Sequence, residues 1–277
     1  MLKTRVLTAI ALLPLVLGML FLASAAAWMA FAAAIALVSC WEWSRLCGFG
    51  PVARRVFLVA SAAIGAALAA AYLRGPESVF ANLAQASFVA SAYFWVFAVP
   101  AWLALRLRPE PWASGLAGWF VLWPMWAALV VLREASPWIL LACAALVWVA
   151  DIAAYFAGRR FGRRKLAPAI SPGKTWEGVY GALAAVAAYA LALAPYARDA
   201  GYGGSVAAGP TVAWVVLALA LTGLSICGDL LESLLKRHAG VKDSGRLLPG
   251  HGGILDRTDA LLAAMPAAAL AALVFLR

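Results

Sequence analysis

The sequence predicts an all-α polytopic membrane protein with about nine transmembrane helices. Of its 277 residues, 66% are hydrophobic and only 12% are charged, and the mean hydropathy is +0.91. A soluble chain of this length needs a largely polar surface. The apolar residues are also grouped into stretches close to the roughly 20 residues that a helix needs to cross a bilayer.

These apolar stretches follow one another along the whole chain. We expect spans at about 6–22, 24–41, 56–73, 86–105, 115–132, 137–156, 176–196, 211–228 and 260–276. The first also has the pattern of a cleavable signal peptide, with basic residues before the apolar centre and small residues after it. We expect residues 1–25 to be retained as a helix, because the apolar run is long and another follows directly.

The distribution of Lys and Arg predicts the orientation of the spans. One side of the membrane would carry 18 of the 22 basic residues, and the other only Arg74, Arg133, Arg198 and Arg277. Because basic residues accumulate in cytoplasmic loops, the N-terminus is predicted to be cytoplasmic and the C-terminus noncytoplasmic. Loops that face anionic lipid also account for the basic excess, so nucleic acid is not expected as a partner.

The charged residues divide the chain into two regions. Residues 1–135 hold about five spans, whereas residues 136–277 hold the others and two charged loops, at 157–175 and 237–256, that are predicted to be cytoplasmic. Acids stand at the cytoplasmic helix ends of this second region: Asp151, Glu177, Asp229, Glu232, Asp256 and Asp259. An uncompensated charge within a bilayer costs at least about 2.5 kcal/mol, so such acids are normally paired, hydrated or bound to metal. The alternative is that water near the helix ends alone accounts for them.

Two pairs of these acids have the spacing of metal ligands on a helix. Asp229 and Glu232 are three residues apart, as are Asp256 and Asp259, and residues at this spacing share a helix face. Carboxylate oxygens suit Mg²⁺, and all four are predicted metal ligands. The alternative is a network of salt bridges, in which Arg246 and Arg257 would neutralise the last two acids. Neither a zinc site nor a disulfide framework is predicted from the four cysteines, Cys40, Cys47, Cys143 and Cys227.

Basic residues and glycines beside these acids indicate anion binding. On the helix that ends in GDLLESLLKR, Lys236 and Arg237 fall on the same stripe as Asp229. The glycines of LPGHGGILD would let backbone N–H groups approach a phosphate, although glycines also merely form turns. SPGKTWEG, at 171–178, is not a P-loop, because Pro168 replaces the required glycine, but it places Lys174 beside a helix start.

The sequence resembles the phosphatidate cytidylyltransferase family, also called CDP-diacylglycerol synthase. The signature of that family reads S-x-x-K-R, then K-D-x-G, then P-G-H-G-G-x-x-D-R-x-D, and every specified residue is present between Ser233 and Asp259. The resemblance also covers SPGKTWEG, DIAAYFAGRRFG at 151–162, and LKTRVLTA and WEWSRL near the start. One departure is Gly173, where many members have a second basic residue, and this puts one supporting phosphate contact in doubt.

The resemblance implies transfer of the cytidylyl group of CTP to phosphatidic acid, with CDP-diacylglycerol and pyrophosphate as products. It implies Mg²⁺, leaves a second cation open, and suggests a homodimer in the bacterial inner membrane with a cytoplasmic active site. The expected catalytic residues are Asp229, Lys236, Asp256 and Asp259. The expected substrate-binding residues are Ser171, Lys174, Thr175, Ser233, Arg237, Lys242, Asp243, His251, Gly252, Gly253 and Arg257.

Other classes of protein remain as alternatives. A secondary transporter also carries acids in its helices, but its sites lie near the midplane of the membrane. A CDP-alcohol phosphotransferase would need D-x-x-D-G, and Ala260 follows Asp259 here. A CTP-dependent lipid kinase of the dolichol kinase type is the nearest alternative, and it would release CDP instead of pyrophosphate.

Overall fold

The computed structural model describes residues 2–75, 79–199 and 209–275, and most of them are helical. The first five helices are α1 (Leu2–Leu22), α2 (Ala25–Leu46), α3 (Pro51–Leu73), α4 (Ala81–Tyr93) and α5 (Val99–Leu105), and the π-helical turn η2 (Phe94–Ala98) joins the last two. The others are α6 (Pro111–Ala135), α7 (Pro137–Phe161), α8 (Trp176–Asp199), α9 (Gly209–His238) and α10 (Leu255–Phe275). Two strands, β1 (Lys165–Ala167) and β2 (Ser171–Thr175), lie between α7 and α8.

Each predicted span matches one of these helices or the continuous run from α4 to α5, except that residue 24 precedes α2 and residue 276 lies outside the described residues. In the described part of the chain, 8 helices are long and apolar enough to cross a membrane. The helix α1 is not among them, since its described apolar part, Ile10–Leu22, is shorter. The expected polytopic membrane protein is therefore confirmed, but the count of nine spans is not.

Proline, glycine and serine mark the helix boundaries. Ser24 caps α2 by accepting a hydrogen bond from Ala27 N at 3.2 Å. Ser136 accepts one from Trp138 N at the start of α7, where Pro137 occupies the first helical position and has no N–H to satisfy. Both features are local, so the sequence alone indicates these boundaries.

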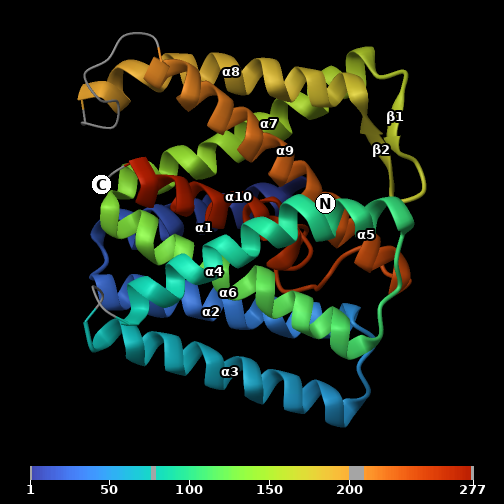
Figure 1. Cartoon of the computed structure of the whole chain (residues 1–277). Coiled ribbons are helices and arrows are strands. Elements are labelled where there is room, and N and C mark those ends of the chain that lie inside the picture. The colour runs from blue at the N-terminus through green and yellow to red at the C-terminus, as the bar shows by residue number, and fades with distance from the viewer. Residues whose placement is uncertain (1, 76–78, 200–208, 276–277) are drawn as a thin grey trace.

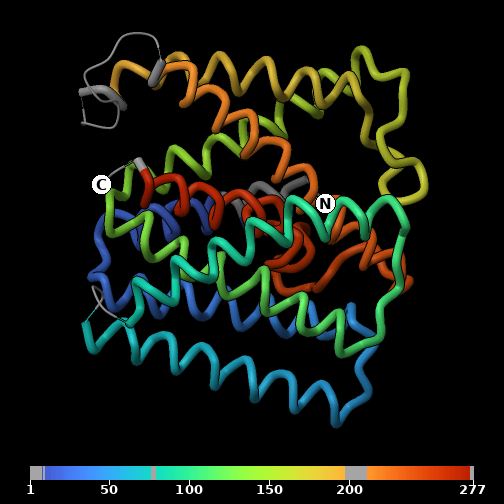
Figure 2. The backbone as a smooth tube through the Cα atoms, in the orientation of Figure 1, coloured from blue at the N-terminus to red at the C-terminus, as the bar shows by residue number. Residues whose placement is uncertain are grey.

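The helix α10 runs through the middle of the bundle (Figure 1). It packs against α9 and α7 on one side and against α6, α4 and α2 on the other. The division at residue 135 remains a prediction, and this packing shows that helices from both regions share one core. The smooth trace in Figure 2 shows the same arrangement of the helices.

The strands β1 and β2 form a small antiparallel hairpin that the all-α prediction did not include. Lys165 pairs with Thr175 and Ala167 with Ser171. Helix is disfavoured here because Pro168 and Pro172 lack the N–H groups that a helix interior requires. The hairpin projects from one end of the bundle, which we name the hairpin end (Figure 1). The loop at 239–254, between α9 and α10, lies at the same end.

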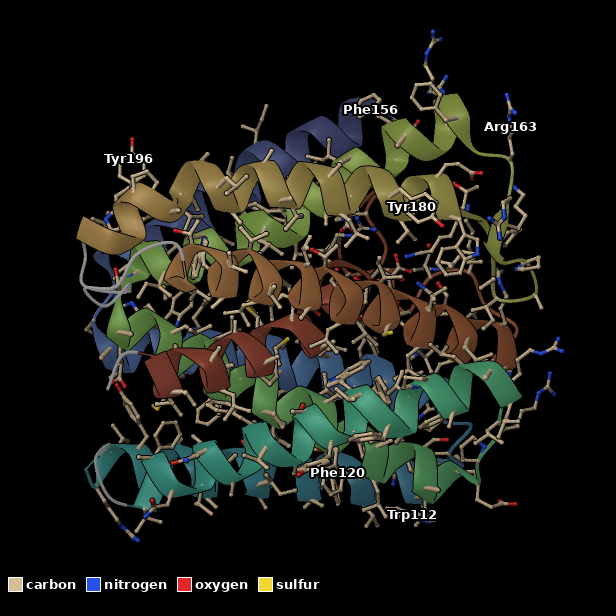
Figure 3. All side chains as sticks on the ribbon, turned by 45° about the horizontal axis from the view of Figure 1, so that its top comes forward. Trp112, Phe120, Phe156, Arg163, Tyr180 and Tyr196 are labelled. Carbon is tan, nitrogen blue, oxygen red and sulfur yellow. The ribbon has the colours of Figure 1, made fainter. Side chains whose placement is uncertain are left out.

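The outer surface of the bundle is apolar and aromatic. Phe120 on α6, Phe156 on α7, and Tyr180 and Tyr196 on α8 are each at least half exposed (Figure 3). A soluble protein rarely exposes so many large apolar side chains. Such a surface is typical of helices in contact with lipid.

Tight packing between α2 and α6 fixes the position of α2. Trp43 Nε1 donates a hydrogen bond to Ser114 O at 2.8 Å, and the ring of Trp43 covers Gly118 so closely that no side chain would fit there. Both Trp43 and the preceding residue, Glu42, are fully buried. The helix α2 thus carries an acid into the interior of the protein.

Candidate active site

The end of α9 forms one part of the site. This helix continues to His238, ten residues beyond the end predicted for its span, so Asp229, Glu232, Ser233 and Lys236 are all helical. Lys236 Nζ lies 2.5 Å from Glu232 Oε2, and Ser233 Oγ donates to Asp229 Oδ1 at 3.2 Å. The predicted stripe of anionic and cationic side chains is present.

The first turn of α10 faces this stripe. Lys236 Nζ lies 2.7 Å from Asp256 Oδ1, which joins the two helices. The other oxygen of Asp256 accepts hydrogen bonds from Ser244 N at 2.9 Å, Ser244 Oγ at 2.9 Å and Gly253 N at 2.8 Å. The alternative salt-bridge network assigned Arg246 and Arg257 to this acid, but Lys236 is its cationic partner and both arginines are exposed.

The hairpin supplies a second lysine. Lys174 Nζ lies 2.5 Å from Asp229 Oδ2, so β2 is linked to α9 by an ion pair. Asp151 on α7 and Asp259 on α10 are both close enough to Asp229 to interact with it electrostatically. Carboxylates from α7, α9 and α10 therefore gather around two lysines, which is the convergence that the sequence predicts.

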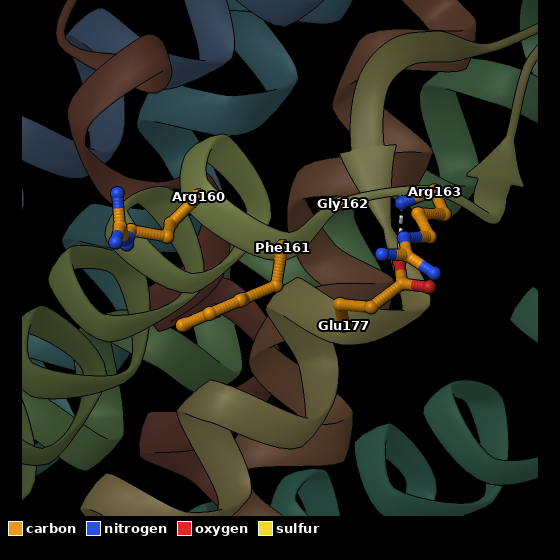
Figure 4. A pocket seen from close by; sticks show the side chains of 5 residues that line it. All are labelled: Arg160, Phe161, Gly162, Arg163 and Glu177. Carbon is orange, nitrogen blue, oxygen red and sulfur yellow. Dashed lines mark hydrogen bonds between the residues drawn. The ribbon is translucent and has the colours of Figure 1, made fainter.

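Glu177 has a different role from these five acids. Its carboxylate accepts hydrogen bonds from Arg163 N at 3.0 Å and Arg164 N at 3.2 Å, and so holds the chain that leaves α7 against the start of α8 (Figure 4). Negative charge is favoured in the first turn of a helix. Thr175 caps the same helix, since its Oγ1 accepts a hydrogen bond from Gly178 N at 3.2 Å.

Glycines shape the loop between α9 and α10. Gly250 and Gly252 have φ of +77° and +85°, a conformation that other residues rarely adopt. Leu248 pairs with Gly252, and His251 N donates to Leu248 O at 2.8 Å, so the loop turns sharply back on itself. His251 Nδ1 is buried and, among the described residues, has no hydrogen-bonding partner.

The remaining predicted substrate-binding residues border this cluster. Arg237 is exposed and donates from Nε to Ile170 O at 3.2 Å, at the tip of the hairpin. Ser171 is half-buried in β2, and three others are exposed: Lys242, Asp243 and Arg257. Their contact with a substrate stays a prediction.

Glu42 is a site residue that the sequence analysis did not single out. Its Oε2 accepts a hydrogen bond from Leu255 N at 2.7 Å, and its Oε1 accepts one from Ile254 N at 3.2 Å. Ser244 Oγ lies 3.1 Å from Glu42 Oε2. The available signal was a lone acid within the apolar stretch before WSRL, because ionisable residues inside a membrane segment are seldom without function.

Two hollows lie beside the cluster. One has a volume of about 420 Å³ and is lined by Arg160, Phe161, Gly162, Arg163 and Glu177 (Figure 4). The other has a volume of about 380 Å³ and is lined by Leu105, Arg106, Arg108, Ala169, Leu234, Arg237 and His238. Neither is lined by the clustered carboxylates, and both are open and basic.

The donor groups of the cluster fit a magnesium ion that is completed by a substrate. In the described part of the chain, no three His, Cys, Asp or Glu side chains are close enough to hold a metal by themselves. Mg²⁺, however, is usually held by one or two carboxylates together with water and substrate phosphates. Glu232 Oε1 is buried and has no hydrogen-bonding partner among the described residues, so this oxygen is available to such an ion.

The fold and this site define a class of protein: a polytopic helical membrane protein with a charged site, suited to polyanions, where three helices and a hairpin meet. The sequence matches the cytidylyltransferase family over residues 3–275. It is 42% identical to a phosphatidate cytidylyltransferase of Pseudomonas aeruginosa over 96% of this chain and 95% of that protein. It is 35% identical to one of Haemophilus influenzae over 96% of each chain. The chain belongs to the cytidylyltransferase family.

Some relatives match only part of the chain. The phosphatidate cytidylyltransferase of Bacillus subtilis is 45% identical over 124 residues, which are 44% of this chain. That of Brucella suis is 54% identical over 121 residues, or 43% of this chain. These two partial matches are 45% and 54% identical, compared with 42% and 35% for the two relatives that are matched over nearly the full length.

Proposed function

We propose that this protein transfers the cytidylyl group of CTP to phosphatidic acid and releases pyrophosphate. The observation that carries the proposal is the cluster in which Lys174 and Lys236 neutralise Asp229 and Asp256. This cluster lies in a chain that is similar over nearly its full length to proteins named phosphatidate cytidylyltransferase. Both proposed substrates are polyanions, and such a site can exchange its internal ion pairs for pairs with phosphate.

The reaction needs positioning and charge neutralisation more than it needs a strong base. A phosphate oxygen of phosphatidic acid attacks the α-phosphorus of CTP, and the bond from that phosphorus to the bridging oxygen breaks, so pyrophosphate leaves. The attacking oxygen is already anionic at neutral pH. The residues therefore have to hold two anions together and stabilise the charge on the leaving group.

The lysines and arginines at the hairpin end supply this stabilisation. Lys236 is poised between Glu232 and Asp256, and Lys174 lies against Asp229. Each ammonium would turn toward phosphate oxygens when CTP binds. Arg237, Lys242 and Arg257 are exposed around them and would contact the triphosphate or the lipid phosphate.

The carboxylates would hold Mg²⁺. When bound, this ion would supply positive charge that stabilises the phosphates of the substrate and the leaving group. Asp229, Asp259 and Glu232 are the candidates for the one or two carboxylates that would hold it together with substrate phosphates, and the proposal leaves a second cation open. Asp256, also a predicted ligand, has three of its hydrogen bonds directed at the loop, so we give it the additional role of fixing the loop.

The proposed setting follows from the orientation of the bundle. We propose that the hairpin end is cytoplasmic in the bacterial inner membrane, because most Lys and Arg lie there. CTP would then reach the site from the cytoplasm, and phosphatidic acid from the surrounding lipid. A homodimer is part of this proposal on the basis of family resemblance.

The alternatives differ in what they would release or move. A transporter would bind its cargo near the midplane, whereas Asp256 and Asp259 lie at the start of α10, and Asp151 and Asp229 lie ten and nine residues before the ends of α7 and α9. A lipid kinase would transfer the γ-phosphoryl group. The test is an assay of purified protein in detergent with cytidine-labelled CTP and phosphatidic acid. We expect lipid-soluble cytidine and an equal amount of pyrophosphate, and no lipid-soluble label would contradict the proposal.

A further inference from the structure

We infer that Glu42 is a positioning residue that holds the loop at 239–254 and the start of α10 in place for the reaction. This inference rests on the proposed function, because it concerns turnover. Glu42 belongs to α2, far in sequence from every residue assigned to the site so far. Its role follows from its burial, its hydrogen bonds and the glycines that surround it.

The carboxylate of Glu42 is buried, and among the described residues no cation forms an ion pair with it. Glu42 has no exposed surface, and the groups that contact its oxygens are Ile254 N, Leu255 N and Ser244 Oγ. A buried carboxylate is costly unless donors satisfy its oxygens. The first N–H groups of α10 and the positive end of its dipole provide that compensation.

The loop is built to receive this carboxylate. A side chain at Gly245 or Gly253 would overlap the oxygens of Glu42, so the backbone of the loop can lie against the acid only where glycine stands. Gly245 and Gly253 are both buried. The contact therefore places both arms of the loop against one side chain.

Glu42 and Asp256 share the task of holding the loop. Asp256 accepts hydrogen bonds from Ser244 N and Gly253 N, while Glu42 accepts from the next two N–H groups, those of Ile254 and Leu255. Ser244 Oγ lies between the two carboxylates, 3.1 Å from Glu42 and 2.9 Å from Asp256. Its single proton can be donated to only one of them at a time.

The consequence for the reaction runs through the first turn of α10. Leu255 is fully buried and directly precedes Asp256, which lies one turn before Asp259. If Leu255 N is released from Glu42, this turn loses an anchor and both acids shift relative to Asp229 and Lys236. A misplacement of about 1 Å in an active site can lower turnover on the order of 10²-fold.

The experiment compares Glu42→Gln with the unchanged protein in detergent, by hydrogen exchange and by turnover. Gln keeps the size of the side chain, but one carboxylate oxygen is replaced by an NH₂ group. This group cannot accept a hydrogen bond from the backbone N–H groups of the loop. We expect amides in 244–255 to exchange on the order of tenfold faster, whereas amides of α3 and α6 are unchanged. We expect kcat at saturating substrates to fall on the order of tenfold or more, with little change in the melting temperature.

Two further variants keep the test decisive. Glu42→Asp keeps the charge but is one methylene shorter, so its exchange and turnover should fall between those of Gln and the unchanged protein. Ser244→Ala alters the same contact from the loop side and should show the same local rise in exchange, even if Glu42→Gln fails to fold. Glu134→Gln is the control. Glu134 lies near the C-terminal end of α6, where it accepts a hydrogen bond from Tyr72 and does not contact the loop at 239–254 through any described hydrogen bond.

Three results would overturn the inference. Unchanged hydrogen exchange of the amides in 244–255 would show that Glu42 does not anchor the loop. Faster exchange spread equally over α2, α3 and α6 would show that Glu42 stabilises the whole fold and not the loop in particular. Faster exchange in 244–255 with unaltered turnover would show that Glu42 anchors the loop but that this contact does not affect the reaction. If the unchanged protein shows no turnover at all, the proposed function fails, while exchange still decides whether Glu42 anchors the loop.

Discussion

Lys236 Nζ lies 2.7 Å from Asp256 Oδ1 and joins the end of α9 to the first turn of α10. The same ammonium lies 2.5 Å from Glu232, a residue with almost no exposed surface. One lysine thus neutralises two acids from different helices. It contributes both to the stability of the site and to the charge that a phosphate would meet.

This relationship predicts that Lys236→Met destabilises the folded protein. Removal of the cation leaves two carboxylates unpaired, and breaking a buried pair in this way costs about 3 kcal/mol or more. Thermal unfolding in detergent is the measurement. Arg237→Met is the matched control, because Arg237 is exposed and its Nε donates to the carbonyl of Ile170, so the stability of this variant should change by less than about 1 kcal/mol. Equal stability of the two variants would show that the pairs of Lys236 contribute nothing to the fold.

Asp259→Asn tests the proposed metal ligands. Asn keeps the shape of the side chain but removes its charge, and loss of an electrostatic contact of this kind lowers turnover on the order of 10²- to 10³-fold. We expect the variant to remain folded and to require more Mg²⁺ for its remaining activity. Glu110→Gln is the control, since Glu110 is an exposed acid before α6. Normal turnover with an unshifted Mg²⁺ curve would remove Asp259 from the site.

Reporter fusions test the orientation of the bundle. Residues 75 and 134 lie near the last residues of α3 and α6, at one end of the bundle, whereas residues 108, 165 and 245 follow α5, begin β1 and belong to the loop at 239–254, at the hairpin end (Figure 1). Residue 200, which is also expected on the noncytoplasmic side, lies outside the described residues. We expect fusions at the first two positions to report the noncytoplasmic side and fusions at the other three to report the cytoplasm. A consistent inversion would place the site on the wrong side for cytoplasmic CTP.

Close packing of α7 on α8 depends on a glycine. A side chain at Gly181 would overlap Cβ of Ala157, and small residues of this kind let membrane helices approach closely. Gly181→Val is expected to destabilise the protein by about 1 to 3 kcal/mol, the usual cost of overpacking. Gly223→Val is the same change on α9, where the space is open, and should cost less. The difference in melting temperature between the two variants measures the contact.

The helices were predictable because each apolar run had to be long enough to span a bilayer. Their ends were less so: α9 continues to His238, since its last turns bury Leu230, Leu231, Leu234 and Leu235 while Lys236 and Glu232 neutralise each other. Because a span predicted from apolar composition ends where charged residues begin, the sequence analysis ended this span at residue 228. The hairpin was missed because its two short strands carry no alternating pattern and consist partly of proline and glycine.

The acids and lysines of the site were predicted from spacing and resemblance, and the structure brings five of the six acids together. Spacing within one helix could not reveal which lysine meets which acid, because Lys174 and Asp229 come from separate elements. Glu42 was missed for the same reason. Its three hydrogen-bonding partners, Ser244, Ile254 and Leu255, lie 202, 212 and 213 residues further along the chain.

The most direct test of the proposed reaction uses CTP labelled at either the α- or the γ-phosphorus. Purified protein is incubated in detergent with phosphatidic acid, Mg²⁺ and one labelled nucleotide, and the lipid phase is then extracted and counted. Cytidylyl transfer predicts that label from the α-position enters the lipid while label from the γ-position is released as pyrophosphate. Label entering the lipid from the γ-position alone would identify a lipid kinase and contradict the proposed function.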